Sequence, residues 1–362
     1  MNYFTVGVNH KSCPLEVREK LFLGGARLER VLAQCASAFP DAEWLVLSTC
    51  NRTEIYGAFP AADRAVEAAV RVLEDECMLE RDVFEPYLFF FRGWETVRHL
   101  FRVAAGLDSL VVGENEILGQ LRKALQSARE AGTVRMFLTR MGEKALKAGK
   151  EIRSRTRLNR GAVSVPSVAV ALAKKIFGKL AGEKVMVLGT GEMSVATLKC
   201  LQEAGAKVVT VVSRLQERGE AVAGQFGAEW IPLCAWESRA RTVDILIAAT
   251  GAPHTLIHEQ QVREIMEARD FRPLFLIDIA VPRNINPSVQ GIQEVYLYNI
   301  DDLKGIAAAN LRARHAEIEK AEKQIQDAVT VFEQGFRRRA LADFDPPGFS
   351  QAPDRVQDPL LS

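Results

Sequence analysis

The chain contains 362 residues, 48% hydrophobic and 26% charged, which is more than one hydrophobic core usually organises, so we expect an ordinary globular protein with two domains. A formal net charge of +1 excludes a global attraction to nucleic acid or to an anionic membrane, so any contact with RNA must come from local clusters of charge. The chain shows no apolar run of the roughly 20 residues that a transmembrane helix needs and no signal sequence, and we expect a cytoplasmic protein without membrane contact.

Six cysteines are scattered along the chain without any C-x-x-C pair. This spacing argues against a structural zinc site, and we expect no metal. Because a cytosolic chain also disfavours disulfides, most of these cysteines should be plain buried thiols. A functional cysteine must therefore be identified by its neighbours.

The first part of the chain alternates strands with a helix. Apolar runs predict strands over 3–9 and 44–49, with helical spacing between them. The second run ends in Cys50, Asn51 and Arg52, and TEIYGAF follows with the alternation of another strand. We therefore expect these three residues at a turn, where side chains face a cleft and not a core.

A helical region and then an alternating region follow. Helical spacing extends over 94–157, with Gly106 and Gly132 as the expected breaks, and Pro166 suits the start of the next helix. Short apolar runs beyond it predict strands over 184–188, 207–212, 243–249, 274–279 and 295–298. Strands that alternate with helical patterns indicate a doubly wound parallel sheet.

A long helix is predicted after Asp301. Its apolar residues at every seventh position are Leu311, Ile318, Ile325 and Phe332. Such a narrow seam suits a partner helix, but a surface helix that packs on its own domain fits equally well. From Asp343 the chain is rich in proline and polar residues, and we expect it to be disordered.

A glycine-rich loop points to a dinucleotide. Gly189, Gly191 and Ser194 occupy the three positions of a G-x-G-x-x-G motif between a strand and a helix, although serine replaces the third glycine. A glycine-rich turn without a ligand is the alternative. The next strand ends in Ser213 and Arg214, where an NAD site usually has an acidic residue, so NADP is the better prediction, with a merely solvated arginine as the competing interpretation.

Cys50 is the candidate nucleophile. A cysteine at a strand end is usually buried and inert, but Arg52 can favour the thiolate, and neighbouring N–H and hydroxyl groups can hold an oxyanion. A cysteine nucleophile combined with NADPH suggests the reduction of a thioester to an aldehyde.

Three further groups of polar residues have two interpretations each. His99, on a helix with apolar neighbours, is by spacing alone more often a satisfied core residue than a catalytic one. Ser109, Glu114, Asn115, Glu116 and Gln120 cluster near a loop-to-helix junction, where they bind an amino acid or cap a helix. Lys144, Lys147, Lys150, Arg153 and Arg157 form either a phosphate-binding stripe or a solvated face.

Taken together, these stretches resemble the glutamyl-tRNA reductase family. The similarity runs from GVNHKSCPLEVREKL through STCNRTEIY, GLDSLVVGENEILGQ, RTRLNRGAVSVPSVAV and VLGTGEMS to TGAPH, LFLIDIAVPR and YLYNIDDL. It covers about residues 3–335, and STCNR together with the GLDSLVVGE block is highly specific.

The resemblance implies a reaction and a set of site residues. Cys50 would attack the ester carbonyl of glutamyl-tRNA(Glu), release the tRNA and hold glutamate as a thioester, which NADPH reduces to glutamate-1-semialdehyde. His99 matches the histidine that the family needs for activity, and Arg52 would pair with the substrate's side-chain carboxylate. The implied substrate pocket comprises Thr49, Asn51, Arg52, Ser109, Glu114, Asn115, Glu116 and Gln120. The implied NADP loop comprises Gly189, Thr190, Gly191, Glu192, Met193 and Ser194.

The same resemblance sets the expected fold and domains. We expect an α/β chain with an N-terminal α+β catalytic domain over 1–155, a Rossmann-like NADP-binding domain over 156–300, a long C-terminal spinal helix over 301–342 and a disordered tail over 343–362. The family's usual dimerisation domain is largely absent from this sequence, so a homodimer is uncertain. The family also implies glutamate-1-semialdehyde aminomutase as a partner.

Departures from the family pattern leave one alternative. Glu116 stands where the family commonly has glutamine, which exchanges a donor for a carboxylate, and Ser194 replaces a frequent glycine. With the short C-terminus, they leave open a non-catalytic relative that binds tRNA or a partner protein. Retention of Cys50, Arg52 and His99 favours the enzyme, and STCNR disfavours a generic NADP dehydrogenase.

Overall fold

The computed structural model describes residues 2–59, 63–110, 112–113, 116–156, 164–302 and 315–342. The predictions for Glu114, Asn115, Arg157, Leu311 and the tail over 343–362 lie outside this part of the chain. Within it, no helix is long and apolar enough to cross a membrane.

The N-terminal domain is built on an antiparallel sheet of four strands. These are β1 (Asn2–Asn9), β2 (Glu43–Thr49), β3 (Arg52–Phe59) and β4 (Phe89–Arg92), in the order β2-β3-β1-β4. The helices of this domain are α1 (Leu15–Arg18), α2 (Ala26–Ala38), α3 (Asp63–Cys77), α4 (Arg81–Phe84), α5 (Trp94–Ala105), α6 (Glu116–Glu130) and α7 (Met136–Arg155), with a 3-10 turn η1 (Glu85–Tyr87). The edge strand β4 was not predicted, because its four residues are short and show no alternation of apolar and polar side chains.

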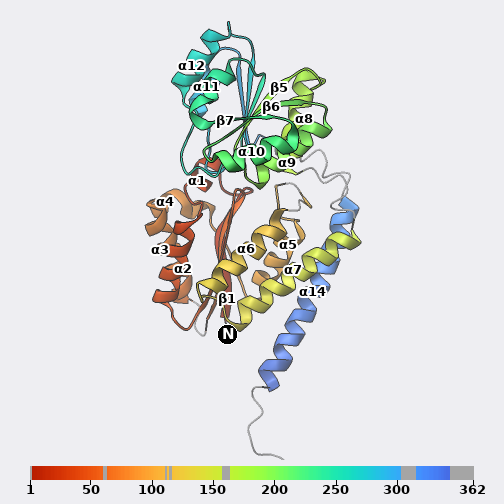
Figure 1. Ribbon diagram of the computed structural model, residues 1–362. Coiled ribbons are helices and arrows are strands. Elements are labelled where there is room, and N and C mark those ends of the chain that lie inside the picture. Colours follow the sequence, from red (N-terminus) through yellow and green to blue (C-terminus); the bar gives the residue numbers. More distant parts are fainter. Residues whose placement is uncertain are drawn as a thin grey trace, which may run out of the picture.

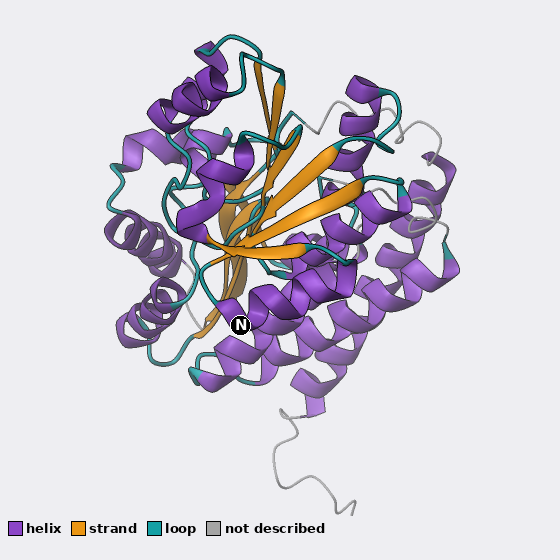
Figure 2. Ribbon diagram, turned by 45° about the horizontal axis from the view of Figure 1, so that its top comes forward, coloured by secondary structure: helices purple, strands orange, loops and turns teal. Residues whose placement is uncertain are grey.

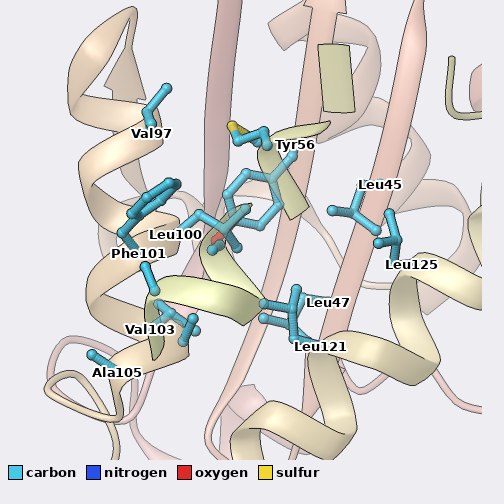
Figure 3. Close-up of a cluster of buried hydrophobic side chains, with 14 of the residues drawn as sticks. Leu45, Leu47, Tyr56, Val97, Leu100, Phe101, Val103, Ala105, Leu121 and Leu125 are labelled. Carbon is cyan, nitrogen blue, oxygen red and sulfur yellow. The ribbon is translucent and has the colours of Figure 1, made fainter. Parts of the chain in front are cut away.

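Both faces of this sheet are covered, so β1, β2 and β3 are buried at nearly every position, polar residues included. Phe4, Trp44 and Val46 face the helices α2 and α3, whereas alternate residues face α5, α6 and α7. Figure 3 shows Leu45, Leu47 and Tyr56 on the second face, opposite side chains of α5 and α6. The sheet is thus the middle layer of three (Figure 1).

Two predicted helix breaks are confirmed. Gly106 ends α5 in the left-handed conformation with φ 77°, and Gly132 has φ 67°. Close packing holds α7 against α5, because a Cβ atom at Gly149 would lie 2.5 Å from the carbonyl oxygen of Ala104. Pro166 lies in the first turn of α8 (Val165–Phe177), as predicted.

The second domain is a parallel sheet of six strands. These are β5 (Lys184–Leu188), β6 (Lys207–Ser213), β7 (Glu229–Pro232), β8 (Ile245–Ala248), β9 (Leu274–Asp278) and β10 (Val295–Asn299). The connecting elements are α9 (Glu192–Glu203), α10 (Gln216–Phe226), η2 (Leu233–Ala235), α11 (Trp236–Ala240), α12 (Glu259–Ala268) and η3 (Pro287–Gly291). Helices flank this sheet on both sides (Figure 2).

The order β10-β9-β8-β5-β6-β7 is that of a Rossmann fold, with the reversal of strand order between β5 and β8. The predicted doubly wound sheet is therefore confirmed, although the short strand β7 was missed. Ligands of such sheets bind beyond the carboxyl ends of the strands, next to the reversal. The loop after β5 lies at this position.

The long helix α14 (His315–Ala342) packs along the N-terminal domain (Figure 1). Ile325 and Phe332 are buried among residues of α5 and α7, and Ile318 packs against the same cluster. Of the two interpretations of the heptad seam, packing on the helix's own chain is the one observed.

Candidate functional site

The Cys50 turn, formed by Cys50 and Asn51, connects β2 to β3. Thr49 pairs with Arg52 as the last pair of the ladder, so Cys50 lies at the very end of the sheet. The turn is fixed by its own chain: His10 N–H donates to the Asn51 carbonyl at 2.8 Å, and Asn51 N–H donates to Thr49 Oγ1 at 3.2 Å. The Cys50 side chain is half-buried, whereas Asn51 is buried. The predicted turn is confirmed, but the expectation that its side chains face a cleft is wrong, because Asn51 and Arg52 are buried and Cys50 packs on a hydrophobic cluster.

Arg52 is buried and shares Glu54 with His99. Arg52 Nη1 donates to Glu54 Oε1 at 2.8 Å, and Arg52 Nη2 donates to the Asp108 carbonyl at 2.7 Å. His99 Nε2 lies 3.1 Å from the same Glu54 oxygen, and Tyr56 Oη donates to the other at 2.6 Å. Strand alternation places residues 52, 54 and 56 on one face, which explains this row of contacts.

The charges of this row keep Glu54 ionised. Burial raises the pKa of the Glu54 carboxyl, but Arg52 and His99 lower it by more. The net result is a pKa of about 2, below the ordinary 4.5. An ionised carboxylate only accepts hydrogen bonds, so His99 Nε2 carries the proton of this contact. The same ion pair more than offsets burial at Arg52, whose pKa lies above its usual value. Glu54 thus holds the cation of Arg52 in place.

Asp108 closes this network from the loop after α5. It accepts from Lys11 Nζ at 2.6 Å and from Arg102 Nε at 3.2 Å, and its Oδ2 atom lies 3.8 Å from His99 Nδ1. Burial raises the pKa of Asp108, but Arg102 and Lys11 lower it well below its usual range. His99 thus lies between two carboxylates and reaches the Cys50 turn through Glu54 and Arg52.

Four predicted substrate residues each carry a buried polar atom that has no hydrogen-bond partner among the residues that the structure describes. These atoms are Asn51 Oδ1, Arg52 Nε, Ser109 Oγ and Glu116 Oε2. Buried polar groups are rarely left unpaired, so such a set is typical of a site built for a polar ligand. Burial raises the pKa of Cys200 on α9, and the charges of Glu203 and Glu116 add to this rise. Gln120 is half-buried one turn further along α6.

The predicted basic stripe on α7 is not continuous. Lys144, Lys147 and Lys150 are exposed, but Arg153 is buried and donates from Nη2 to the Gly113 carbonyl at 3.1 Å. The role of Arg153 is therefore to hold the loop between α5 and α6. The interpretation of the five basic residues as one exposed stripe is therefore wrong for Arg153.

The glycine-rich loop has the geometry of a phosphate site. Gly189 has φ 116°, and a Cβ atom there would lie 2.6 Å from the Ala249 carbonyl oxygen. Gly191 caps α9, and no atom lies within 4 Å of where its Cβ would be. Ser194 is buried and its Oγ donates to the Ala249 carbonyl at 3.0 Å, so serine fits the position of the third glycine.

The remaining residues of the predicted cofactor site differ in their exposure. Thr190 and Met193 are half-buried, whereas Glu192 is exposed and accepts from Lys123 Nζ at 2.7 Å. At the end of β6 the Ser213 hydroxyl donates to the Leu215 carbonyl and accepts from an indole N–H, so it is already engaged within the fold.

Arg214 is exposed beside Ser213, and of this pair its guanidinium is the group that faces solvent. A 2′-phosphate at this strand end would thus be met by the arginine.

The Cys50 turn and the nucleotide domain meet directly. Cys50 and Met193 both pack against the hydrophobic cluster of the parallel sheet, to which Leu15 and Leu110 of the N-terminal domain also belong. Arg18 of α1 donates from Nε to the Cys50 carbonyl at 3.1 Å. Because Arg18 also donates from Nη2 to Asp301, just after β10, the Cys50 turn lies at the carboxyl edge of the parallel sheet.

Glu54 and Arg18 were not predicted as functional residues. Glu54 follows Arg52 by two positions, and this alternation was the only signal that could have identified it. Arg18 lies far in the sequence from two of the groups that it binds, and a single sequence carries no signal for such a contact.

A Rossmann sheet whose carboxyl edge faces a cysteine turn defines a two-domain, nucleotide-dependent oxidoreductase. The family model "Glutamyl-tRNAGlu reductase, N-terminal domain" matches residues 6–156, and "Shikimate / quinate 5-dehydrogenase" matches residues 171–306. The chain is 43% identical over 327 residues to glutamyl-tRNA reductase of Thermus thermophilus, covering 90% of this chain and 78% of the relative. The chain belongs to the glutamyl-tRNA reductase family, which confirms the resemblance.

Other relatives agree with this assignment. Glutamyl-tRNA reductase of Trichlorobacter lovleyi is 39% identical over 332 residues, which cover 92% of this chain and 76% of the relative. The solved structure of glutamyl-tRNA reductase from Methanopyrus kandleri shares 36% identity with a TM-score of 0.52, over 94% of this chain and 83% of that chain. The chain is thus an oxidoreductase of the family that reduces glutamyl-tRNA in the first step of tetrapyrrole biosynthesis. A non-catalytic relative is not favoured.

Proposed function

We propose that the chain reduces glutamyl-tRNA(Glu) to glutamate-1-semialdehyde through a thioester on Cys50, with NADPH as the reductant. The observation that carries this proposal is the position of Cys50, at the end of one sheet and packed against the cluster of the parallel sheet. A cysteine thiolate is a stronger nucleophile than water at neutral pH, and its thioester is a better hydride acceptor than an oxygen ester.

Arg52, Ser109 and Asn51 hold the glutamyl group of the substrate for attack. Arg52 is fixed by Glu54, and its Nε atom is buried without a partner, so it can donate to the glutamyl side-chain carboxylate. The unpartnered atoms of Ser109 and Asn51 offer further contacts to the glutamyl group. Attack by Cys50 Sγ on the ester carbonyl forms the C–S bond and releases the ribose hydroxyl of the tRNA.

The loop after β5 fits NADPH. Open space in front of Gly191 and the start of α9 suit a pyrophosphate, and Arg214 suits the 2′-phosphate. When bound, NADPH supplies the hydride that converts the thioester into an aldehyde. The chain's own part is to hold the thioester carbonyl at the carboxyl edge of the parallel sheet and to take back the thiolate when the C–S bond breaks.

His99 acts as a positioning residue in this proposal. Its contacts are with Glu54, Asp108 and the rings of Tyr56, Phe89 and Phe91. It therefore keeps Glu54 in place for Arg52, and its loss should weaken substrate binding more than it weakens the nucleophile.

Covalent capture tests the proposal. Purified protein is mixed with charged glutamyl-tRNA without NADPH, quenched in acid and examined by intact-protein mass spectrometry. We expect a glutamyl thioester on wild-type protein and on Cys200→Ser, but not on Cys50→Ser. Release of tRNA without any adduct in wild-type protein, at the same rate as in Cys50→Ser, would disprove covalent capture.

The product suggests a partner. An aldehyde reacts readily with amines, and the resemblance implies that glutamate-1-semialdehyde aminomutase takes it up directly. We keep this contact as a prediction, and whether the chain forms a homodimer stays an open question. Sedimentation velocity of the protein alone and mixed with the aminomutase measures both.

A further inference from the structure

The short helix α1 lies at the junction of the two domains (Figure 1). Its Arg18 side chain is completely buried. The guanidinium donates from Nη1 to the Cys13 carbonyl at 2.8 Å, from Nε to the Cys50 carbonyl at 3.1 Å, and from Nη2 to Asp301 Oδ1 at 2.7 Å. One side chain thus joins the main chain of the nucleophile to a carboxylate of the second domain.

Asp301 is fixed to the end of β10. Ile300 beside it is completely buried in the cluster of the parallel sheet, and Asp301 N–H donates to Asn299 Oδ1 at 2.8 Å. Asp301 therefore moves together with the carboxyl edge of the parallel sheet. The guanidinium of Arg18 is a planar, rigid group that binds both Asp301 and the Cys50 carbonyl. A shift of the sheet edge is therefore passed on to that carbonyl.

A second ion pair keeps α1 docked on the nucleotide domain. Arg283 donates from Nη2 to Glu19 Oε1 at 2.7 Å and from Nε to Glu19 Oε2 at 3.0 Å. Its loop is held by Asp278, which accepts from the N–H groups of Asn284 and Ile285, both at 2.8 Å. Because this pair does not touch the Cys50 turn, Asp301 can be altered while α1 remains attached.

We propose that Arg18 is a positioning residue for hydride transfer, because it sets the Cys50 turn against the nucleotide domain through Asp301. This inference rests on the proposed thioester at Cys50. Reacting atoms must approach to about 3–3.5 Å, and a misplacement of about 1 Å can cost a hundredfold in rate. A displaced Cys50 carbonyl also displaces its Sγ atom and the acyl group bound to it.

The thioester has two fates that report this geometry. In reduction, a hydride adds to the carbonyl carbon, the C–S bond breaks, the thiolate returns to Cys50 and NADPH becomes NADP⁺. In hydrolysis, the oxygen of water bonds to that carbon, the same C–S bond breaks, and glutamate leaves without any change of oxidation state. Once the glutamate that charged tRNA releases without protein is subtracted, the ratio of glutamate to semialdehyde measures hydride positioning and does not depend on how much of the protein is folded.

The test compares product ratios at saturating NADPH in wild type, Asp301→Asn, Asp301→Glu and Arg18→Lys, with Arg81→Gln as a control. Asp301→Asn removes the carboxylate that Arg18 reaches in the second domain. Arg18→Lys cannot reach all three acceptors. Arg81 forms ion pairs on the surface, with Glu67 and Glu85.

We expect the ratio of glutamate to semialdehyde to rise about tenfold in Asp301→Asn and in Arg18→Lys. Asp301→Glu, which keeps a carboxylate, should lie between Asp301→Asn and wild type, and Arg81→Gln should match wild type. If Arg18→Lys does not fold, Asp301→Asn decides alone, since its side chain is 22% exposed.

An unchanged ratio in Asp301→Asn would overturn the positioning role while the thioester stands. Absence of Cys50-dependent products from wild-type protein would instead overturn the proposed function, and the positioning role with it. The wild-type measurement therefore separates the two failures.

Discussion

Glu54 is the residue through which the charges of the site are connected. It is completely buried and accepts from Arg52, His99 and Tyr56. Breaking a buried ion pair by removing one partner leaves an uncompensated charge, which is far more costly than losing an exposed pair. The same carboxylate therefore contributes both to folding and to the orientation of Arg52.

We expect Glu54→Gln to lower the free energy of unfolding by about 3–5 kcal/mol and to weaken binding of glutamyl-tRNA, because Arg52 then remains buried without its carboxylate. Urea titration followed by circular dichroism measures the first effect. Glu67→Gln is the matched control, since Glu67 pairs with Arg81 on the surface and its loss should change stability little. Equal stability of Glu54→Gln and wild type would contradict the assigned role.

Acid should destabilise the protein through this residue. The folded pKa of Glu54, about 2, lies below its ordinary value of 4.5, so its contribution to stability is present above that value and is lost as pH falls toward 2. Between about pH 6 and 3, the free energy of unfolding of wild type should fall more steeply than that of Glu54→Gln. Parallel curves would show that Glu54 titrates normally in the folded protein.

The two glycines of the nucleotide loop should respond differently to alanine. Gly189 needs a positive φ and has no room for a Cβ, so Gly189→Ala should lower the free energy of unfolding. Gly191 has φ −75° and open space, so Gly191→Ala should fold normally but bind NADPH about tenfold more weakly. Calorimetric titration with NADPH, beside thermal unfolding, measures both. Unchanged binding in Gly191→Ala would place the pyrophosphate elsewhere.

At the scale of elements, α14 packs along α5 and α7 and supports both helices. Its buried residues lie on one stripe, while Val331 is 68% exposed on the other side. Because α5 carries His99 and α7 carries Arg153, the helix supports both elements that hold the loop of Asp108 and Ser109. Packing of this helix is thus connected to the position of Ser109, a predicted substrate residue.

Truncation of Ile325 should therefore weaken the whole catalytic domain. The residue is completely buried, and Ile325→Ala should cost about 2–5 kcal/mol in the free energy of unfolding. Val331→Ala, on the exposed side of the same helix, should cost little. Denaturant titrations of the two variants provide the comparison, and similar losses in both would indicate that α14 does not pack as described.

At the scale of the molecule, local signals were readable from the sequence and distant contacts were not. The Cys50 turn, the glycine-rich loop and the ends of α5 and α6 depend on neighbouring residues, and each was predicted. Strands β4 and β7 were missed because they are short edge strands with half-exposed side chains, whereas β8, equally short, is fully buried and shows a clear apolar run.

The contacts of Arg18 with Cys50 and Asp301 span 32 and 283 positions of the chain, and only the folded structure brings these groups together. The same holds for Glu54 and His99, which come from a strand and a helix 45 positions apart. The sequence therefore pointed to the candidate nucleophile and to the glycine-rich loop, but not to the buried charges around them.

The central claim is that the acyl group on Cys50 is the species that NADPH reduces. The most direct measurement is a single turnover in which the thioester is first formed without NADPH and isolated, and NADPH is then added. We predict that semialdehyde appears at the rate at which the adduct disappears, with one NADPH consumed for each aldehyde. Semialdehyde formation by Cys50→Ser, or an adduct that persists while aldehyde accumulates, would contradict the account.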